Sequence, residues 1–417
     1  MDAPYPIRPV DDSELAAFRG VSDHAFNSHW PTAELLRYDR MVTEPERTLA
    51  AFDGGQMVGT TLVFSFGMTV PGGEVLPTAA VSGVSVLPTY RRQGILSSLM
   101  RRQLADIAAA GEPLAALFAS ESVIYGRYGY GAATEELDFT VRRGEGGFRP
   151  LRSGAPPPPL RLADPADALP TIRAVYDAVQ PGRPGMLVRT DAWWQLHAED
   201  PEFLREGSSP MRAVIAEDGS GARGFALYNV KPGGSGDGLF AQTLRIRDLY
   251  WTDPAACAAL WSDLLSRDLV SEVRAGARPV DDPLRYLLAD PRRARARVSD
   301  GLWVRLVNIP EALTRRQYAA PVDLVVDVTD QLIPANQGRW RLTAGGPADG
   351  GKPSCEPTTA EADIALPVSA LGAAYLGGAR LGGLLAAGQI TENRPGAVAE
   401  LSTAMSWDPA PWCPTGF

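Results

Sequence analysis

Residues 91–97, Arg-Arg-Gln-Gly-Ile-Leu-Ser, contain the residue types best suited to binding a phosphate. Arg91 and Arg92 supply positive charge, and Gly94 has no Cβ, so a ligand can approach the backbone closely. A helical pattern follows directly, and the free N–H groups and dipole of a helix N-terminus favour an anion. The spacing is neither the Rossmann Gly-x-Gly-x-x-Gly nor a P-loop, which needs a lysine. We therefore predict a pyrophosphate-binding turn; the simpler alternative is a strand–turn–helix with two solvated arginines.

This turn needs a strand before it and a helix after it, and the sequence predicts both. The apolar residues 77–87 indicate a strand that stops at Pro88. Residues 95–110 place apolar side chains at helical spacing, and Gly111 suits the position just after a helix. The wholly apolar residues 114–119 indicate a central strand. Upstream we predict a helix capped by Asp12 and Ser13 and ending at about Arg19, and strands at 47–52 and 57–66 around the turn 53–56.

The same order of elements recurs after a linker. Residues 144–147 and 153–159 are rich in glycine and proline, which indicates a boundary near residue 150. Beyond it we predict a helix at 164–179, strands at 211–217, 224–230 and 243–251, and a helix with Asp253 as cap and Pro254 in its first turn. The paired arginines and the glycine of the phosphate turn are absent at this second junction. The second copy is therefore predicted to keep the architecture without the binding site.

Residues 301–417 indicate a third α/β region of different character. Strands are predicted at 302–307, 322–328, 339–343 and 362–366, and helices at 310–318, 369–376 and 381–387. The last two helices are rich in alanine and glycine, which permits either close packing or a lipid-sized tunnel. The chain is therefore predicted to be an α/β protein of three domains, residues 1–150, 151–300 and 301–417, in keeping with its length.

The composition is that of a globular protein with a mildly acidic surface. Of 417 residues 45% are hydrophobic, and 40 basic against 49 acidic residues leave a net charge of −9. This balance argues against nonspecific binding to nucleic acid and is compatible with a cationic substrate. Three cysteines and three histidines are too scattered for a disulfide framework or a metal site. No signal peptide or transmembrane stretch is indicated, so we expect a cytoplasmic protein without membrane contact.

Two further segments join the phosphate turn. Residues 119–131 read Ala-Ser-Glu-Ser-Val-Ile-Tyr-Gly-Arg-Tyr-Gly-Tyr-Gly, and residues 70–79 read Val-Pro-Gly-Gly-Glu-Val-Leu-Pro-Thr-Ala. With the Arg-Arg-x-Gly turn and the three-part layout, they resemble the Eis family of GCN5-related N-acetyltransferases of actinobacteria. The resemblance spans the chain and implies a catalytic and a degenerate GCN5-related domain followed by a domain like sterol carrier protein. It also implies acetyl-CoA as cosubstrate, an amine-bearing substrate and a homo-oligomer, usually a hexamer.

The resemblance also implies which residues act. The general acid would be Tyr125, and the general base would be the α-carboxylate of Phe417, the last residue. The amine-binding side would be walled by Phe26, Trp30, Phe66 and Met68. The residues implied to contact coenzyme A are Val84, Ser85, Val86, Arg91, Arg92, Gln93, Gly94, Ile95, Leu96, Ser97, Ser120 and Glu121.

The chemistry of acetyl transfer explains why such groups are needed. A lysine-type amine has a pKa of about 10.4, so a base must remove a proton from it at neutral pH. Apolar surroundings raise the pKa of an α-carboxylate from about 3.5 and make it a better base. Backbone N–H groups near residues 84–86 can polarise the thioester carbonyl. A phenol with a pKa of about 10 is a weaker acid than a thiol of about 8.5, so we expect Tyr125 to stabilise the thiolate by a hydrogen bond unless its own pKa is lowered.

The amine-binding side departs from the family pattern. Members that acetylate aminoglycosides carry an acidic residue two positions after a phenylalanine and a glutamate before the terminal phenylalanine. Here Ser28 and Gly416 occupy those positions. Two carboxylates that would attract a polycationic antibiotic are absent, so we expect weak or altered aminoglycoside activity. Two other functions stay open, the acetylation of a protein or peptide lysine and a non-catalytic role as a lipid carrier or assembly protein.

Overall fold

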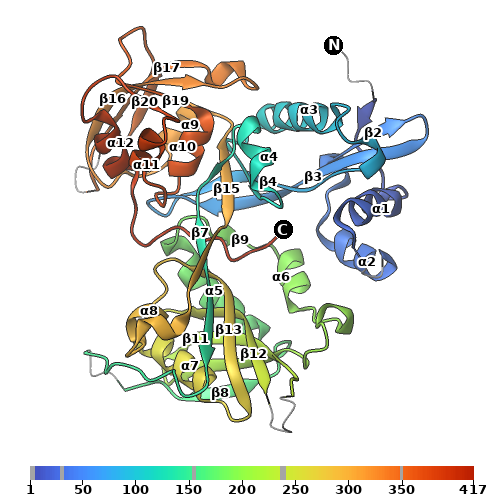
Figure 1. Ribbon diagram of the computed structural model, residues 1–417, viewed down its shortest axis with the longest axis vertical. Helices are drawn as coiled ribbons and strands as arrows, with labels where there is room; N and C mark the ends of the chain where they lie inside the picture. Colours follow the sequence, from blue (N-terminus) through green and yellow to red (C-terminus); the bar gives the residue numbers. More distant parts are fainter. Residues whose placement is uncertain (1–4, 29–31, 153–155, 235–240, 348–350) are drawn as a thin grey trace. The chain divides into compact units, whose positions relative to one another are not determined.

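The computed structural model describes residues 5–28, 32–152, 156–234, 241–347 and 351–417 (Figure 1). The chain forms two compact units. The first consists of Met1–Thr134, Pro184–Trp193 and Gly301–Phe417, and the second of Glu135–Arg183 and Trp194–Asp300. Each unit is built around its own mixed sheet, and the first unit contains a further sheet formed by the C-terminal region. This is the α/β architecture that the sequence predicts.

The main sheet of the first unit has the strand order β1-β2-β3-β4-β5-β15-β6, with β9 pairing on β3. Adjacent residues of β3 point to opposite faces, as in any strand. Leu62 packs with the core beneath helix α1, and Val63 packs with the core beneath helix α3. The two helices therefore cover opposite faces. The strands are β1 Ile7–Arg8, β2 Thr48–Asp53, β3 Gln56–Thr69, β4 Val75–Val86, β5 Leu114–Phe118, β6 Gly131–Ala132, β9 Leu187–Val188 and β15 Leu302–Leu306, and the helices are α1 Leu15–Phe26, α2 Thr32–Val42, α3 Ile95–Ala109 and α4 Ser122–Tyr125.

The predicted first helix is wrong in its cap and its length. Helix α1 begins at Leu15 and continues to Phe26, well beyond Arg19. Its preceding turn is closed by Asp11, whose carboxylate accepts the N–H groups of Ser13 and Glu14. Helix α2 was not predicted from the sequence. Polar residues separate its apolar positions, so the helical spacing of the apolar residues is hard to see in the sequence. In the structure, the buried residues Leu35 and Tyr38 mark the apolar face.

The second unit contains a sheet of order β14-β7-β13-β12-β11-β10-β8. Helix α7 covers it through Leu260, Trp261 and Leu264, and begins as predicted, with Asp253 as cap and Pro254 in its first turn. The predicted helix at 164–179 begins later, at Leu169. The elements are β7 Glu135–Arg142, β8 Leu160–Ala163, α5 Leu169–Val179, β10 Arg212–Asp218, β11 Gly221–Lys231, β12 Gln242–Trp251, α7 Pro254–Ser266, β13 Val270–Pro279, α8 Leu284–Leu287 and β14 Arg297–Asp300, with α6 Asp191–Ala198 shared between the units.

The C-terminal region forms a sheet of order β18-β17-β16-β19-β20 covered by four short helices. Helix α10 approaches the main sheet very closely, because a Cβ on Gly372 would lie 2.2 Å from the carbonyl oxygen of Val304. At this helix the small residues therefore serve close packing. The elements are α9 Ile309–Thr314, β16 Val322–Thr329, β17 Gly338–Ala344, β18 Ser354–Pro357, β19 Ile364–Pro367, α10 Val368–Ala374, α11 Leu381–Ala386, β20 Thr391–Glu392 and α12 Ala397–Met405, of which α12 was not predicted.

Two strands pair with sheets outside their predicted segments. Strand β7 lies within residues 1–150, yet it pairs with β13 and β14 in the second unit. Strand β15 lies within residues 301–417, yet it pairs antiparallel with β5 in the main sheet of the first unit. The three-domain division by residue number therefore stays a proposal, with these two strands as its exceptions.

Candidate active site

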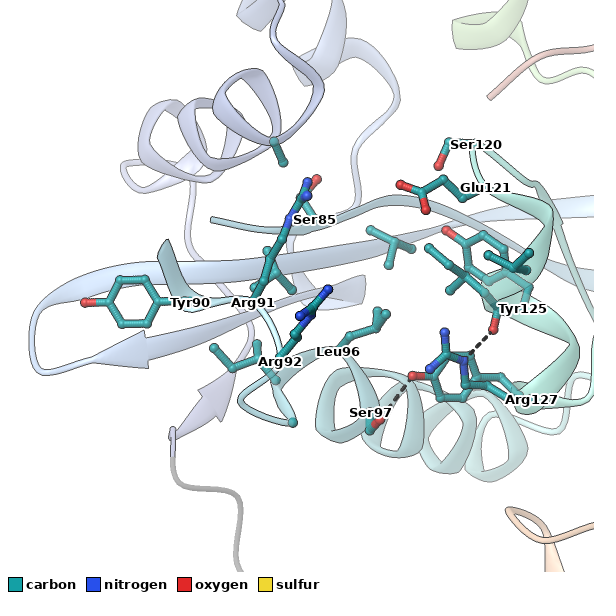
Figure 2. A pocket seen from close by; sticks show the side chains of 18 of the residues that line it. Ser85, Tyr90, Arg91, Arg92, Leu96, Ser97, Ser120, Glu121, Tyr125 and Arg127 are labelled. Atoms are coloured by element: carbon teal, nitrogen blue, oxygen red, sulfur yellow. Dashed lines mark hydrogen bonds between the residues drawn. The ribbon is translucent and has the colours of Figure 1, made fainter. Parts of the chain in front are cut away.

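A cleft opens in the first unit where two parallel strands part. Strands β4 and β5 pair from Thr78 and Leu114 to Ala80 and Ala116, and beyond that point their described residues are not paired with one another. Strand β4 nevertheless runs on to Val86 beside β3. The cleft that results has a volume of about 740 Å³ and is shown in Figure 2. It is lined by Ala25, Phe26, Asn27, Val84, Ser85, Val86, Tyr90, Arg91, Arg92, Gly94, Ile95, Leu96, Ser97, Ser120, Glu121, Val123, Ile124, Tyr125, Arg127 and Tyr128.

A β-bulge directs the end of β4 into this cleft. Thr60 pairs with Ser85 and Leu62 pairs with Ser82, so Gly83 and Val84 together lie opposite a single residue of β3. Gly83 has a φ of +59°, a conformation that favours glycine. A bulge bends its strand and redirects the backbone. The predicted coenzyme residues 84–86 therefore all line the cleft.

The N-terminus of helix α3 is open toward the cleft. Gly94 is its N-cap, with a φ of +83° and no side-chain hydrogen bond, and no atom lies within 4 Å of the position of a Cβ. The first N–H groups of an α-helix have no partner within the helix. Arg91 and Arg92 are exposed and extend over this end of the cleft (Figure 2). Neither guanidinium forms an ion pair within the described part of the chain. This end is therefore suited to bind an anion such as a pyrophosphate.

Gln93 is the one predicted coenzyme residue that does not line the cleft. Its side-chain oxygen accepts a hydrogen bond from the Tyr5 hydroxyl. A contact between this residue and a phosphate would therefore use its backbone. Tyr5 in turn packs edge-on against Tyr90, at 6.0 Å between ring centroids.

Tyr125 lies at the end of the short helix α4, with its side chain 5% exposed. Burial raises the pKa of its phenol above 10, and a hydrogen bond with Ser120 lowers the pKa only in part. The ring of Tyr130 packs edge-on against it at 6.2 Å between centroids. The pKa is thus shifted away from that of a thiol, so Tyr125 is suited to donate a hydrogen bond while keeping its proton.

Several lining residues were missed by the sequence prediction. Arg127 and Tyr128 belong to the tyrosine- and glycine-rich block, so a signal for them was present. Tyr128 shares a hydrogen bond of 3.1 Å with Ser97 of α3, which ties that block to the helix that begins at the phosphate turn. Val123 belongs to the same block, whereas Tyr90 and Ala25 carry no pattern of their own and enter the cleft only through the fold.

The predicted amine-binding residues fall in different places. Phe26 is 52% exposed and lines the cleft, whereas Trp30 lies outside the described residues. Phe66 and Met68 are buried in the core and do not line the cleft. The ring of Phe66 instead lies 6.0 Å from that of Phe417. Phe66 therefore adjoins the C-terminal residue that the resemblance assigns as base.

Aromatic side chains lie next to Phe417. Its half-buried ring is 5.1 Å from that of Phe118, at the end of β5. Trp193 packs against Phe66 at 4.8 Å and against Phe64 at 5.1 Å. The side chain of Phe417 therefore lies at the edge of a group of aromatic rings.

The residues that the structure describes contain neither a candidate metal centre nor a candidate membrane span. No group of three or more His, Cys, Asp or Glu side chains is placed to hold a metal ion within those residues. Within the same residues, no helix is both long and apolar enough to cross a bilayer.

Comparisons with known proteins agree with the fold. Family models for acetyltransferase (GNAT) domains match residues 6–133 and 185–306, and a model for a sterol carrier protein domain matches residues 309–414. The fold and the cleft thus define a GCN5-related N-acetyltransferase, a class of enzymes that use acetyl-CoA.

Similar chains narrow the assignment. An uncharacterized N-acetyltransferase of Streptomyces coelicolor is 46% identical over 98% of this chain and 99% of its own length. The N-acetyltransferase Eis of Mycobacterium tuberculosis is 34% identical over 85% of this chain and 84% of its own. The crystal structure of Eis1 from Mycobacterium abscessus superposes with a TM-score of 0.83 at 32% identity, over 99% of this chain and 100% of the other. The chain belongs to the Eis family of N-acetyltransferases, which favours an enzyme over the non-catalytic alternative.

Proposed function

We propose that this enzyme transfers an acetyl group from acetyl-CoA directly to a primary amine. The observation that carries the proposal is the open N-terminus of α3 beside the cleft where β4 and β5 part. There the coenzyme pyrophosphate would lie against Arg91, Arg92 and the N–H groups of residues 94–97. The pantetheine arm would run along residues 84–86 toward Tyr125, with Ser120 and Glu121 on the opposite side.

In the proposed reaction the amine nitrogen attacks the thioester carbonyl carbon. A C–N bond forms and the C–S bond breaks, so the electron pair of that bond leaves with the sulfur. The raised pKa of Tyr125 keeps its phenol protonated, and the phenol therefore stabilises the thiolate as a hydrogen-bond donor. The thiolate needs no full proton from Tyr125, because a thiol is the stronger acid of the two.

We further propose that the Phe417 carboxylate accepts the proton that the amine loses. The rings of Phe66 and Phe118 beside Phe417 support this role, since apolar surroundings make a carboxylate more basic. Mass spectrometry of the intact purified protein tests whether it ends at an unmodified Phe417 and so carries this α-carboxylate.

The amine substrate is proposed to carry one reactive amine on a scaffold of low charge. Ser28 and Gly416 supply no carboxylate, and the residues near Phe417 are aromatic. Weak turnover of polycationic aminoglycosides is expected for this reason.

We also propose, from the family resemblance, that the chain forms a homo-oligomer.

Release of free thiol from acetyl-CoA across a panel of amines tests the function. The panel contains aminoglycosides, polyamines, aromatic monoamines and lysine peptides. Turnover is expected to be highest with monoamines that carry an apolar group. Turnover of lysine peptides alone would indicate a protein acetyltransferase. Failure to bind coenzyme A, measured by calorimetry, would overturn the proposal.

A further inference from the structure

The last residues of the chain are unusually well ordered by contacts. Chain termini normally fray unless something holds them. Here Trp412 is 4% exposed, Cys413 1% and Thr415 5%. Gly416 is exposed and Phe417 is half-buried. Three of the four residues 412–415 are thus buried, and some other part of the chain must cover them.

That part of the chain is the segment 184–189. Strand β9 within it pairs with the end of β3, with Val188 opposite Gly67 and Leu187 opposite Met68. The Gly185 N–H donates to the Thr69 carbonyl at 2.8 Å, which extends this attachment to the main sheet. The segment is therefore fixed to the same strand that carries Phe66.

The other side of the segment holds the tail. The Trp412 N–H donates to the Pro184 carbonyl at 2.8 Å. Gly185 has a φ of +91°, and a Cβ on it would lie 2.9 Å from the carbonyl oxygen of Trp412, so a larger residue does not fit there. The Arg189 Nε–H donates to the Thr415 hydroxyl at 3.1 Å, and both side chains are buried. Arg189 thus reaches the tail two residues before Phe417.

We propose that residues 184–189 form a C-terminal clamp, in which Arg189 and Thr415 are positioning residues for the Phe417 carboxylate. The proposal rests on the proposed function, in which that carboxylate is the base. A base must lie within hydrogen-bond reach of the proton it removes. The clamp reduces the freedom of the tail before the amine binds and so fixes where the base lies.

This role also gives the second acetyltransferase region a part in the reaction. The clamp residues stand at the start of the segment that matches the second acetyltransferase model, residues 185–306. They nevertheless belong structurally to the first unit. A region without the phosphate turn thereby supplies the contact that holds the proposed base.

Carboxypeptidase digestion tests the clamp without requiring activity. Release of Phe417 is followed by mass spectrometry in the full-length protein and in the variants Thr415→Val and Arg189→Lys. Both variants should release Phe417 at least about tenfold faster than the parent protein, because the tail opens more often. The matched control is Thr314→Val, which removes a half-buried hydroxyl that donates to the Pro310 carbonyl in α9. Equal release rates in all four proteins would overturn the clamp.

Kinetics test whether the clamp positions the base. Thr415→Val and Arg189→Lys should lower kcat by about 10- to 100-fold, as small misplacements of reacting groups do, while coenzyme A affinity stays unchanged. Thr314→Val should leave both unchanged. Faster release of Phe417 with an unchanged kcat would show a merely structural attachment and overturn the positioning role.

A C-terminal amide separates this proposal from the proposed function. Cys413 allows the peptide Cys-Pro-Thr-Gly-Phe-amide to be ligated to residues 1–412, which replaces only the carboxylate. Low activity of the amide together with normal activity of the clamp variants would refute the positioning role of the clamp and leave the base in place. Full activity of the amide would refute the base and, with it, the positioning role, whatever the digestion shows.

Discussion

The two acetyltransferase regions differ most where a central strand leads into a helix. In the first region β4 leads into α3 through an exposed turn with two arginines, and the N-cap Gly94 offers no side chain. In the second region β12 leads into α7 through Asp253, whose carboxylate accepts the N–H groups of Ala255 and Ala256 at 2.9 and 3.1 Å. That carboxylate is also paired with Arg223 at 2.7 Å. The chain's own anion thus occupies the helix end that is open in the first region.

The bulge that precedes each helix is common to both regions. In the second region Tyr228 pairs with Ile246 and Leu227 with Asp248, which leaves Arg247 as the extra residue. This corresponds to the extra residue between Ser82 and Ser85 in the first region. The fold therefore does not need the phosphate site. A few residues at the helix end decide whether the same architecture presents free N–H groups to a ligand.

The largest effect on coenzyme A affinity is expected when the N-cap of α3 receives a carboxylate like that of Asp253 in the second region. Gly94→Asp places a negative charge where the pyrophosphate is proposed to bind, and two charges 4 Å apart repel by about 4 kcal/mol at an effective dielectric constant of 20. We expect coenzyme A affinity, measured by calorimetry, to fall at least about a hundredfold. Gly94→Asn introduces a side chain of about the same size without the charge, so it separates the effect of the charge from that of the added atoms. The control is Gly111→Asp, which also has a positive φ and open space but lies beyond the other end of α3. Unchanged affinity in Gly94→Asp would break the comparison.

Tyr125→Phe should have the next largest effect, on the chemical step rather than on binding. It removes a hydrogen bond to the developing thiolate, and bonds to charged groups contribute about 1.5–3 kcal/mol, which corresponds to roughly a 10- to 100-fold lower kcat. Coenzyme A affinity should stay within about twofold, because the ring is retained. Tyr130→Phe is the control, since its buried hydroxyl has no hydrogen-bond partner among the described residues. A kcat equal to that of the parent protein would remove Tyr125 from the mechanism.

Arg92→Ala should weaken coenzyme A binding moderately. An exposed guanidinium beside a phosphate contributes about 1 kcal/mol, so we expect roughly a fivefold loss of affinity that shrinks as salt is added. Arg101→Ala changes an exposed arginine within the helix α3 that follows the turn; this arginine does not line the cleft, and its loss should have no effect. Equal losses in both variants would indicate long-range attraction by net charge in place of a local contact.

Asp253→Ala should have the smallest effect and should act on stability alone. Loss of an N-cap costs about 1 kcal/mol in the free energy of unfolding, measured with urea. Burial opposes ionisation of this carboxyl, but the bonds from Arg223, Ala256 and Ala255 outweigh it and lower its pKa. The contribution is therefore fully present above the unfolded-state pKa of about 4 and is lost as the pH falls through the lower pKa of the folded state.

The control for this variant is Asp268→Ala, which removes a 94% exposed carboxylate of the same unit. Neither variant should gain coenzyme A affinity, because the second region also lacks the arginine pair. Binding at the second site of Asp253→Ala would show that the carboxylate alone blocks a competent site.

The local features of this chain were decided by its sequence. The strand, turn and helix at residues 77–110 and the cap at Asp253 depend on residues within a few positions of one another, and the structure has each of these elements nearly as predicted. That the turn binds a phosphate stays a prediction. Membership of the Eis family also followed from short motifs. Such features can be predicted from a short stretch of sequence, because the hydrogen bonds and the periodicity within one helix or strand involve residues that are close along the chain.

Only the tertiary structure decided how distant segments meet. Strands β7 and β15 pair with sheets outside their own segments, and Arg189 meets a residue 226 positions away. Burial of the Tyr125 phenol, which raises its pKa, likewise depends on neighbours that the fold supplies. No local pattern encodes such contacts, because strand pairing and buried hydrogen bonds depend on which apolar surfaces pack together, and that is settled by the whole chain.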